Sequence, residues 1–294
     1  MKSGTVVLIG RSNVGKSTLL NRLLGEKISI VSNKSQTTRQ RILGVMHRAD
    51  AQIGYLDTPG LHEPTHRLNA RMVRSALDAV DDADILYVVT DAAMGSPTKD
   101  RAVMQAVRRA LTKRPRPALL VVNKVDCVRK PALLPMLDAF SKVHDWAALV
   151  PVSAKTGVNL DRLVDATIGM LPNDEVLYPE DTLTDQSMRA LAGEYIREQV
   201  LHQTYEEVPH SVAVSIEEFR EEGRLARVAA TVWVERTAQK AILIGQGGAR
   251  LKTIGIGARL DMERVFGMKV FLQLWVKVRE SWREDEQMLV ELGY

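Results

Sequence analysis

Short apolar runs alternate with amphipathic stretches along the first half of the chain. The runs have the length and composition of buried strands and lie at 6–9, 53–56, 85–89, 119–122 and 149–152. Apolar residues at helical spacing fill intervals between them, as at 68–80, 100–111 and 160–171. Because strands that alternate with helices build a parallel sheet covered on both faces, the pattern predicts an α/β domain with a mostly parallel sheet over residues 1–171.

The pattern changes after residue 171. Positions 172–185 hold five acidic residues and no Lys or Arg, so we expect a solvated linker over 172–186. Beyond it, the periodicity predicts a helix at 187–203, strands at 212–216 and 227–234, helices at 238–244 and 251–266, and a strand at 269–278. The order α-β-β-α-α-β is that of a type II KH module, so residues 187–294 form a smaller α+β domain.

The first apolar run leads into a phosphate-binding pattern. Gly10 begins the string GRSNVGKS, which has the G-x-x-x-x-G-K-[ST] spacing between a strand and an apolar helical stripe. The two glycines let backbone N–H groups close around phosphate oxygens, Lys16 reaches the β- and γ-phosphates, and the Ser17 hydroxyl ligates Mg²⁺. A nucleoside triphosphate is therefore the first ligand to consider.

A second motif identifies the base. The run at 119–122 ends in Asn123, Lys124, Val125 and Asp126. The Asp126 carboxylate can accept hydrogen bonds from both N1–H and the exocyclic amine of guanine, a pair of donors that adenine lacks. This pattern favours GTP over ATP, with Asn123 and Lys124 joining the base loop to the phosphate loop.

Two further strand ends complete the set. Asp57 and Gly60 follow the run at 53–56, where Asp57 is placed to hold Mg²⁺ and the Gly60 N–H to sense the γ-phosphate. Ser153, Ala154 and Lys155 follow the run at 149–152 and are expected to pack against guanine. The order of these motifs indicates a Ras-like P-loop GTPase domain, with switches at 32–41 and 60–71.

The predicted site residues have nucleotide-binding, metal-binding or catalytic roles. Nucleotide contacts are expected from Gly10, Arg11, Ser12, Asn13, Val14, Gly15, Lys16, Ser17, Thr18, Asp57, Gly60, Asn123, Lys124, Asp126, Ser153, Ala154 and Lys155. Mg²⁺ is expected at Ser17, Thr38 and Asp57, and catalytic roles at Lys16, Thr38, Gly60 and Asn13.

Composition limits the remaining possibilities. The chain has 294 residues, a net charge of +4, a pI near 9.1 and one cysteine. This fits a cytosolic protein without disulfides, with an anionic partner permitted but not identified. The six histidines show no metal-ligand spacing, and no apolar run approaches the length of a membrane span. Membrane contact, if any, is expected to be peripheral, at the inner face of the cell membrane.

The second domain carries a G-x-x-G loop between its central helices. Residues 236–283 contain ten basic and three acidic residues, whereas 187–235 contain five basic and nine acidic ones. This polarity favours RNA binding around the loop, with Ile244 and Ile254 as aliphatic walls. The expected RNA-binding residues are Lys240, Ile244, Gly245, Gln246, Gly247, Gly248, Arg250 and Lys252. The four tryptophans suggest no stacking platform along the sequence, so we expect most of them in the core.

The strings GRSNVGKSTLLNRLLG, QTTRQR, DTPGLHEP, NKVD, SAKTG and IGQGGARLKTIG resemble the bacterial Era GTPase family over nearly the whole chain. The resemblance implies binding of the 3′ end of 16S ribosomal RNA and a K⁺ ion near Asn13 that speeds hydrolysis. Leu61 stands where Ras-like enzymes carry a water-positioning Gln, so intrinsic hydrolysis should be slow. Gln246 and Gly247 replace the basic residues common in such loops, which shifts phosphate contact to Arg250, Lys252 and Lys240.

Three functions are compared. The first is a monomeric GTP-hydrolysing switch that uses GTP/GDP and Mg²⁺, binds 16S rRNA and assists maturation of the 30S ribosomal subunit. The second is an RNA-binding or chaperone module whose GTPase domain regulates occupancy. The third is a signalling or peripheral-membrane GTPase whose C-terminal domain binds another RNA or a protein. The motifs and the resemblance favour the first.

Overall fold

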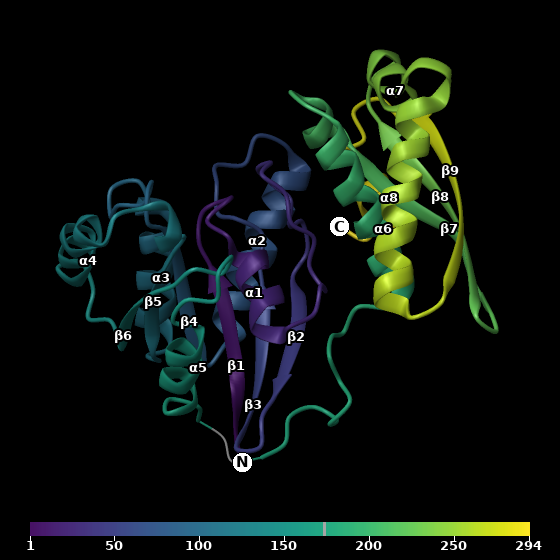
Figure 1. Cartoon of the computed structure of the whole chain (residues 1–294). Coiled ribbons are helices and arrows are strands. Elements are labelled where there is room, and N and C mark those ends of the chain that lie inside the picture. The colour runs from purple at the N-terminus through teal and green to yellow at the C-terminus, as the bar shows by residue number, and fades with distance from the viewer. Residues whose placement is uncertain (173–174) are drawn as a thin grey trace. The chain divides into compact units, whose positions relative to one another are not determined.

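The computed structural model describes residues 1–172 and 175–294, which form two compact units (Figure 1). Unit 1 comprises residues 1–29, 38–64 and 71–185, and unit 2 comprises 30–37, 65–70 and 186–294. Asn173 and Asp174 of the predicted linker lie outside the described residues. None of the described helices combines the length and hydropathy that crossing a bilayer requires.

Unit 1 is built on a six-stranded sheet, as the alternating pattern predicts. Its strands are β1 (Lys2–Ile9), β2 (Ile42–His47), β3 (Ala51–Asp57), β4 (Ile85–Asp91), β5 (Ala118–Asn123) and β6 (Ala148–Pro151). They lie in the order β2-β3-β1-β4-β5-β6, and every neighbouring pair is parallel except β2 with β3. The sheet is therefore mostly parallel, and β2 is an antiparallel edge strand that the apolar pattern did not predict.

Helices cover both faces of this sheet, as Figure 1 shows for unit 1. On one face, α1 (Lys16–Leu24) and α5 (Leu160–Ile168) pack on the inward residues of β1, β3 and β5. On the other, α3 (Arg101–Lys113), α4 (Leu133–Ser141) and the part of α2 (Arg67–Asp82) from residue 71 onward form a second core. Because central parallel strands are buried on both sides, β1, β4 and β5 read as continuous apolar runs.

The carboxyl ends of these strands define the edge where the predicted motifs meet. β1 ends before Gly10, β3 ends at Asp57, β4 at Asp91 and β5 at Asn123. In open parallel sheets, ligands bind at this edge, next to the point where strand order reverses. The reversal falls at β1, which has β3 on one side and β4 on the other. The phosphate loop therefore starts at the reversal point.

The described part of the predicted linker is not purely solvated. The Leu177 and Tyr178 N–H groups both donate to Gln52 Oε1 at 2.8 Å, and Val45 N–H donates to Leu183 O at 2.8 Å. Thr184 also forms an isolated antiparallel bridge with Gly44. Acidic composition indicated exposure, but backbone groups of this segment pair with the β2–β3 edge inside unit 1.

Unit 2 has the predicted α-β-β-α-α-β order. Its elements are α6 (Met188–Gln203), β7 (Ala213–Glu222), β8 (Leu225–Val234), α7 (Thr237–Ile244), α8 (Ala249–Phe266) and β9 (Lys269–Val278). The sheet order is β7-β8-β9, with β8 antiparallel to β7 and parallel to β9. A short helix, α9 (Glu286–Glu291), follows β9.

One face of the unit 2 sheet carries the core. Even-numbered residues of β8, including Ala226, Val228 and Val232, pack with Ile196 of α6 and Ile254 of α8. Figure 1 shows α6 and α8 lying against this face of the sheet. The odd-numbered residues of β8 and β9 therefore point to the opposite face.

The first helix of unit 2 holds the segment 30–37, which belongs to the same compact unit. Val31 N–H donates to Glu198 Oε1 at 2.9 Å, and Arg197 Nη2 donates to Thr37 O at 2.5 Å. Arg197 is 1% exposed, and Glu194 accepts from it as well. Burial opposes the charge, but these acidic partners outweigh it and raise the pKa of Arg197. Part of the first predicted switch is thus hydrogen-bonded to α6.

Candidate functional site

The phosphate loop places Lys16 in a buried position at the start of α1. Its ammonium donates to Gly10 O at 3.2 Å and Arg11 O at 3.0 Å. Burial lowers the pKa of Lys16 from 10.5 to about 8, although the nearby Asp57 carboxylate opposes the shift. The side chain is 6% exposed, so its charge lacks the stabilisation that water or a polyphosphate would give.

Glycines at two positions of the loop have no substitute. Gly15 has φ +96°, and a Cβ there would lie 2.3 Å from Asn123 Nδ2. A Cβ on Gly10 would lie 2.3 Å from Val89 O, on the neighbouring strand. Gly15 has a left-handed backbone, and Gly10 lies in close contact with the neighbouring strand. These two requirements explain why the motif has glycine at both positions.

The side-chain oxygens of Ser17, Thr38 and Asp57, the predicted Mg²⁺ ligands, lie close together near Lys16. Ser17 Oγ donates to Asp57 Oδ2 at 2.5 Å and lies 2.8 Å from Thr38 Oγ1. Asp57 is fully buried, and its Oδ1 has no hydrogen-bond partner. Burial raises the pKa of Asp57 despite Lys16 and the Ser17, Ser29 and Thr38 hydroxyls. Mg²⁺ prefers oxygen ligands of this kind, so the residues present fit the ion.

Gly60 and Leu61 are the first residues of the predicted switch at 60–71, and both pack closely against their surroundings. A Cβ on Gly60 would lie 2.6 Å from both the N and Oγ atoms of Ser12, which brings this backbone against the phosphate loop. Leu61 N–H donates to Gly10 O at 3.1 Å, and the Leu61 side chain is buried in a hydrophobic core. Leu61 therefore has no polar group with which to orient water, and slow intrinsic hydrolysis stays a prediction.

The guanine motif is joined to the phosphate loop by direct hydrogen bonds. Asn123 Nδ2 donates to Val14 O at 2.9 Å, and Asn123 Oδ1 accepts from Ala154 N–H at 3.0 Å. Lys124 Nζ donates to Asn13 O at 2.6 Å. Asn13 itself is exposed, with φ 63°. These contacts give Asn123 and Lys124 the connecting roles that the sequence predicts.

Asp126 lies at the rim of the same site. Its Oδ1 accepts from Ser153 Oγ at 2.6 Å, and this bond lowers the pKa of the exposed carboxyl. Lys155 is exposed beside the buried Ala154. The carboxylate stays ionised at neutral pH and open to solvent, as recognition of two guanine donors requires.

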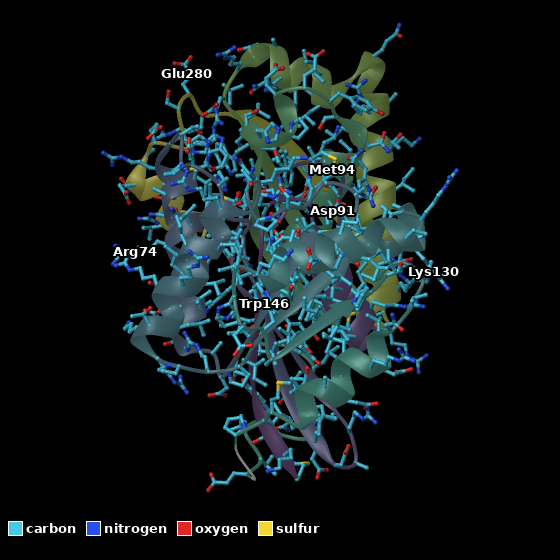
Figure 2. The ribbon with its side chains drawn as sticks, turned by 90° about the vertical axis from the view of Figure 1, so that its left-hand side faces the viewer. Arg74, Asp91, Met94, Lys130, Trp146 and Glu280 are labelled. Atoms are coloured by element: carbon cyan, nitrogen blue, oxygen red, sulfur yellow. The ribbon has the colours of Figure 1, made fainter. Side chains whose placement is uncertain are left out.

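Sequence reasoning missed two carboxylates at this edge. Asp91, at the end of β4, accepts from Lys124 Nζ at 2.7 Å and from Ala93 and Met94 N–H groups; Figure 2 labels Asp91 and Met94. Burial opposes ionisation of Asp91, but these bonds outweigh it and lower its pKa. Asp100 pairs with Arg11 at 2.5 Å. Asp91 follows an apolar run, the same signal that identified Asp57.

In unit 2 the G-x-x-G loop joins α7 to α8 in a glycine-dependent conformation. Gly245, Gly247 and Gly248 have φ of +71°, +58° and +82°. A Cβ on Gly247 or Gly248 would meet nothing within 4 Å, so this side of the loop is open. Arg250 Nη1 donates to Ile242 O at 2.6 Å, which ties this predicted RNA contact to the end of α7.

A groove of about 360 Å³ begins at this loop. It is lined by Gly248, Leu251, Lys252, Gly255, Ile256, Arg259, Leu272 and Leu274. Lys252 and Gln246 are exposed, whereas Lys240 and Ile244 are half-buried and do not line the groove. The expectation for Ile254 is wrong, because this side chain is fully buried in the core. Leu251 and Ile256 supply the apolar wall instead.

The prediction that most tryptophans lie in the core holds for two of them and fails for the other two. Trp146 and Trp282 are 7% and 0% exposed, with ring N–H groups bonded to Phe140 O and Ser211 O. Trp275 on β9 is 46% exposed, and Trp233 on β8 is half-buried. Two of the four rings therefore lie on the unit 2 sheet, outside the core.

Sequence comparisons match both domains of the chain. The profile of a family described as 50S ribosome-binding GTPase matches residues 5–124, and that of the KH domain matches residues 207–283. GTPase Era of Syntrophus aciditrophicus is 44% identical over 295 residues, covering 100% of this chain and 95% of that protein. GTPase Era of Xanthomonas campestris pv. campestris (strain B100) is 47% identical, covering 100% of this chain and 97% of the relative.

Solved structures agree along the whole chain. A crystal structure of Era in complex with MgGDPNP and nucleotides 1506–1542 of 16S ribosomal RNA has a TM-score of 0.96 at 40% identity. It covers 100% of this chain and 99% of that chain. An Aquifex aeolicus Era variant bound to GDP·AlF4⁻ has a TM-score of 0.95 at 40% identity, with the same coverage of both chains.

Proposed function

We propose, from the premise that the chain belongs to the Era family of GTPases, that it is a GTP-driven switch acting on 16S ribosomal RNA. It binds the 3′ end of that RNA and assists maturation of the 30S subunit. The observation that carries the proposal is the full-length similarity to an Era described with MgGDPNP and nucleotides 1506–1542 of 16S rRNA. We also propose that it works in the cytoplasm as a monomer; membrane contact stays a prediction.

The nucleotide site is proposed at the sheet edge of a G domain spanning residues 1–171. The loop from Gly10 to Thr18 holds the phosphates, while Asp126 reads guanine with Asn123 and Lys124 behind it. Ser153, Ala154 and Lys155 complete the base pocket. In support, Asn123 bonds both Val14 and Ala154, so base loop and phosphate loop form one connected frame. Such a frame positions the γ-phosphate before reaction.

Hydrolysis depends on charge stabilisation in this frame. Mg²⁺ held by Ser17, Thr38 and Asp57 would neutralise charge that develops on the phosphate oxygens. Lys16 would exchange its two carbonyl partners for the β- and γ-phosphates, and the Gly60 N–H would meet the γ-phosphate. Because Leu61 is buried, a further element must assist, and we propose K⁺ at Asn13.

The RNA site is proposed on the KH domain of residues 187–294, joined to the G domain by 172–186. Gly245, Gln246, Gly247 and Gly248 would approach the sugar–phosphate backbone, with Arg250, Lys252, Lys240 and Ile244 near it. In support, the loop is open at Gly247 and Gly248 and continues into a groove. A KH loop clamps about four nucleotides.

The bound nucleotide would affect RNA affinity through segment 30–37. Thr38, the proposed Mg²⁺ ligand, directly follows Thr37, whose carbonyl accepts from Arg197 of α6. Release of the ion after hydrolysis would free Thr38 and change the conformation of segment 30–37, which is hydrogen-bonded to α6. RNA affinity is thereby linked to the bound nucleotide.

A gel-shift experiment tests the proposal. Full-length protein is titrated into RNA of nucleotides 1506–1542 of 16S rRNA, with a GTP analogue or GDP. We expect tight binding with the analogue, and loss of binding in Gly247→Asp/Gly248→Asp with basal GTP hydrolysis unchanged. Unimpaired RNA binding by the double variant would refute the groove assignment. No RNA binding in either nucleotide state would leave a signalling or membrane-associated GTPase.

A further inference from the structure

Helices α6 and α8 pack on one face of the three-stranded sheet in unit 2, and the opposite face carries a row of exposed side chains. The even-numbered residues of β9 pack toward the helices, with Val270 and Val276 only 5% and 7% exposed. The odd-numbered residues of β9 point away from that core. In the parallel register, Arg227, Thr231 and Trp233 of β8 share this outer face with them.

The outer face of β9 carries an ordered row of side chains. Lys269, Phe271, Gln273, Trp275 and Lys277 follow one another at every second position, and all five are exposed. Phe271 and Trp275 are each 46% exposed. The row therefore alternates cation, ring, amide, ring and cation, with the two rings about 13 Å apart along the strand. We name these five residues the outer row.

Side chains of β8 hold the outer row in place. The Arg227 guanidinium lies 5.5 Å from the centroid of the Phe271 ring, and Lys277 Nζ lies 5.6 Å from that of Trp233. Trp233 Nε1 donates to Ser215 Oγ at 2.8 Å, which fixes its indole. The cations thus lie beside aromatic surface, the arrangement that suits stacked bases with adjacent phosphates.

The charge of this face suits a polyanion. Glu218 pairs with Arg220 at 2.9 Å and Glu222 with Arg227 at 2.8 Å, while Glu217 accepts from Ser215 Oγ at 2.7 Å. Lys269 lies 3.8 Å from Glu263 Oε2 on α8. On the face itself, Arg220, Arg227, Lys269 and Lys277 oppose three carboxylates, which leaves an excess of one positive charge beside the aromatic rings.

The outer row is continuous with the groove at the glycine loop. Leu272 and Leu274, which alternate with the outer row along β9, line that groove together with Gly248 and Lys252. β9 is also an edge strand of the sheet. A strand of RNA that leaves the groove over this edge reaches the outer row without crossing another element of the sheet.

We propose that the outer row is a second RNA-binding surface, which stacks unpaired bases of the same RNA that the groove clamps. Phe271 and Trp275 provide the stacking rings, Gln273 offers amide hydrogen bonds to base edges, and Lys269 and Lys277 contact phosphates. This inference rests on the proposed RNA binding and extends it, because the groove alone accounts for about four nucleotides.

The test uses full-length protein with a GTP analogue and two RNA probes. The long probe is nucleotides 1506–1542 of 16S rRNA; the short probe is the smallest truncation, of about six nucleotides, whose binding still requires Gly247 and Gly248. The test variant is Phe271→Thr/Trp275→Thr, which keeps strand-forming residues at exposed positions. Val290→Thr, which alters another exposed apolar residue of unit 2, is the control.

We expect the double variant to bind the long probe about tenfold to hundredfold more weakly, with short-probe affinity and GTP hydrolysis unchanged. Trp275→Phe should restore most of the affinity when Phe271 is intact, since it keeps a ring. Lys277→Gln should reduce the slope of log affinity against log salt by about 0.7 for the long probe. Val290→Thr should match wild type throughout.

The other outcomes refute the inference and are distinguishable. Equal long-probe affinity in the double variant and wild type overturns the second surface and leaves the proposed function standing. Equal losses on both probes mean that the rings only support the groove. If RNA affinity is unchanged but co-sedimentation with 30S subunits is lost, the face contacts a protein. If wild type binds neither probe, the proposed function fails as well.

Discussion

The buried ammonium of Lys16 makes nucleotide binding depend on proton uptake. In the ligand-free protein its pKa is about 8, lowered by burial from 10.5 and partly sustained by Asp57. A polyphosphate beside Lys16 favours the charged form and raises the pKa again. Binding should therefore take up about half a proton at pH 8 and about a tenth at pH 7, and triphosphate affinity should be about tenfold lower at pH 9 than at pH 7.

The same titration affects the ligand-free fold. Lys16 has a lower pKa in the folded than in the unfolded chain, so the unfolded chain binds more protons between pH 8 and 10.5. As pH rises through this window, the titration of Lys16 therefore increases the free energy of unfolding by about 3 kcal/mol in total. Lys16→Met should abolish triphosphate binding and remove the rise of ligand-free stability with pH between pH 8 and 10.5.

Calorimetry provides the assay. A non-hydrolysable GTP analogue with Mg²⁺ is titrated at pH 7 and pH 8 in two buffers of different ionisation enthalpy, which gives the number of protons taken up. Lys130→Met is the matched control, because Lys130 is exposed on the loop before α4 (Figure 2). Proton uptake near zero at both pH values, or a Lys16→Met variant whose stability rises with pH as steeply as that of wild type between pH 8 and 10.5, would refute this reasoning.

Three further predictions concern the nucleotide site. Asp126→Asn should weaken GDP binding about tenfold to hundredfold and favour xanthosine diphosphate, whose C2 carbonyl can accept from the new amide; unchanged base preference in a competition assay would refute the role of Asp126. Asn13→Ala should remove a rate advantage of K⁺ over Na⁺ at matched ionic strength, and equal wild-type rates in the two salts would contradict a K⁺ site. Gly60→Ala should lower kcat about a hundredfold, since its Cβ would lie 2.6 Å from the backbone N of Ser12; an unchanged single-turnover rate would count against that contact.

The sequence predicts the parallel strands because each is buried on both faces. Runs such as 119–122 need no alternation to be recognised, and the motifs at their ends follow from topology. The β2 strand was missed because it directly follows a polar switch segment and Gly44 divides its four apolar residues into two pairs. Asp91 and Asp100 were missed because they bind Lys124 and Arg11 across the sheet edge, contacts that only the fold brings together.

The outer face of β9 shows where sequence patterns fail for a different reason. Phe271, Leu272, Leu274 and Trp275 are all apolar, so a period of two cannot tell which face of the strand is covered. Ile254 was misplaced in the same way, because both sides of α8 carry aliphatic residues. Side-chain type indicated the kinds of contact, while burial in the fold decided which residues are free to make them.

The measurement that tests the account most directly is RNA affinity as a function of the bound nucleotide. Wild-type protein is titrated with nucleotides 1506–1542 of 16S rRNA by fluorescence anisotropy, in parallel with a GTP analogue and with GDP, each with Mg²⁺. The account predicts clearly tighter binding in the triphosphate state. Identical affinities in the two states would contradict the claim that the nucleotide controls RNA binding.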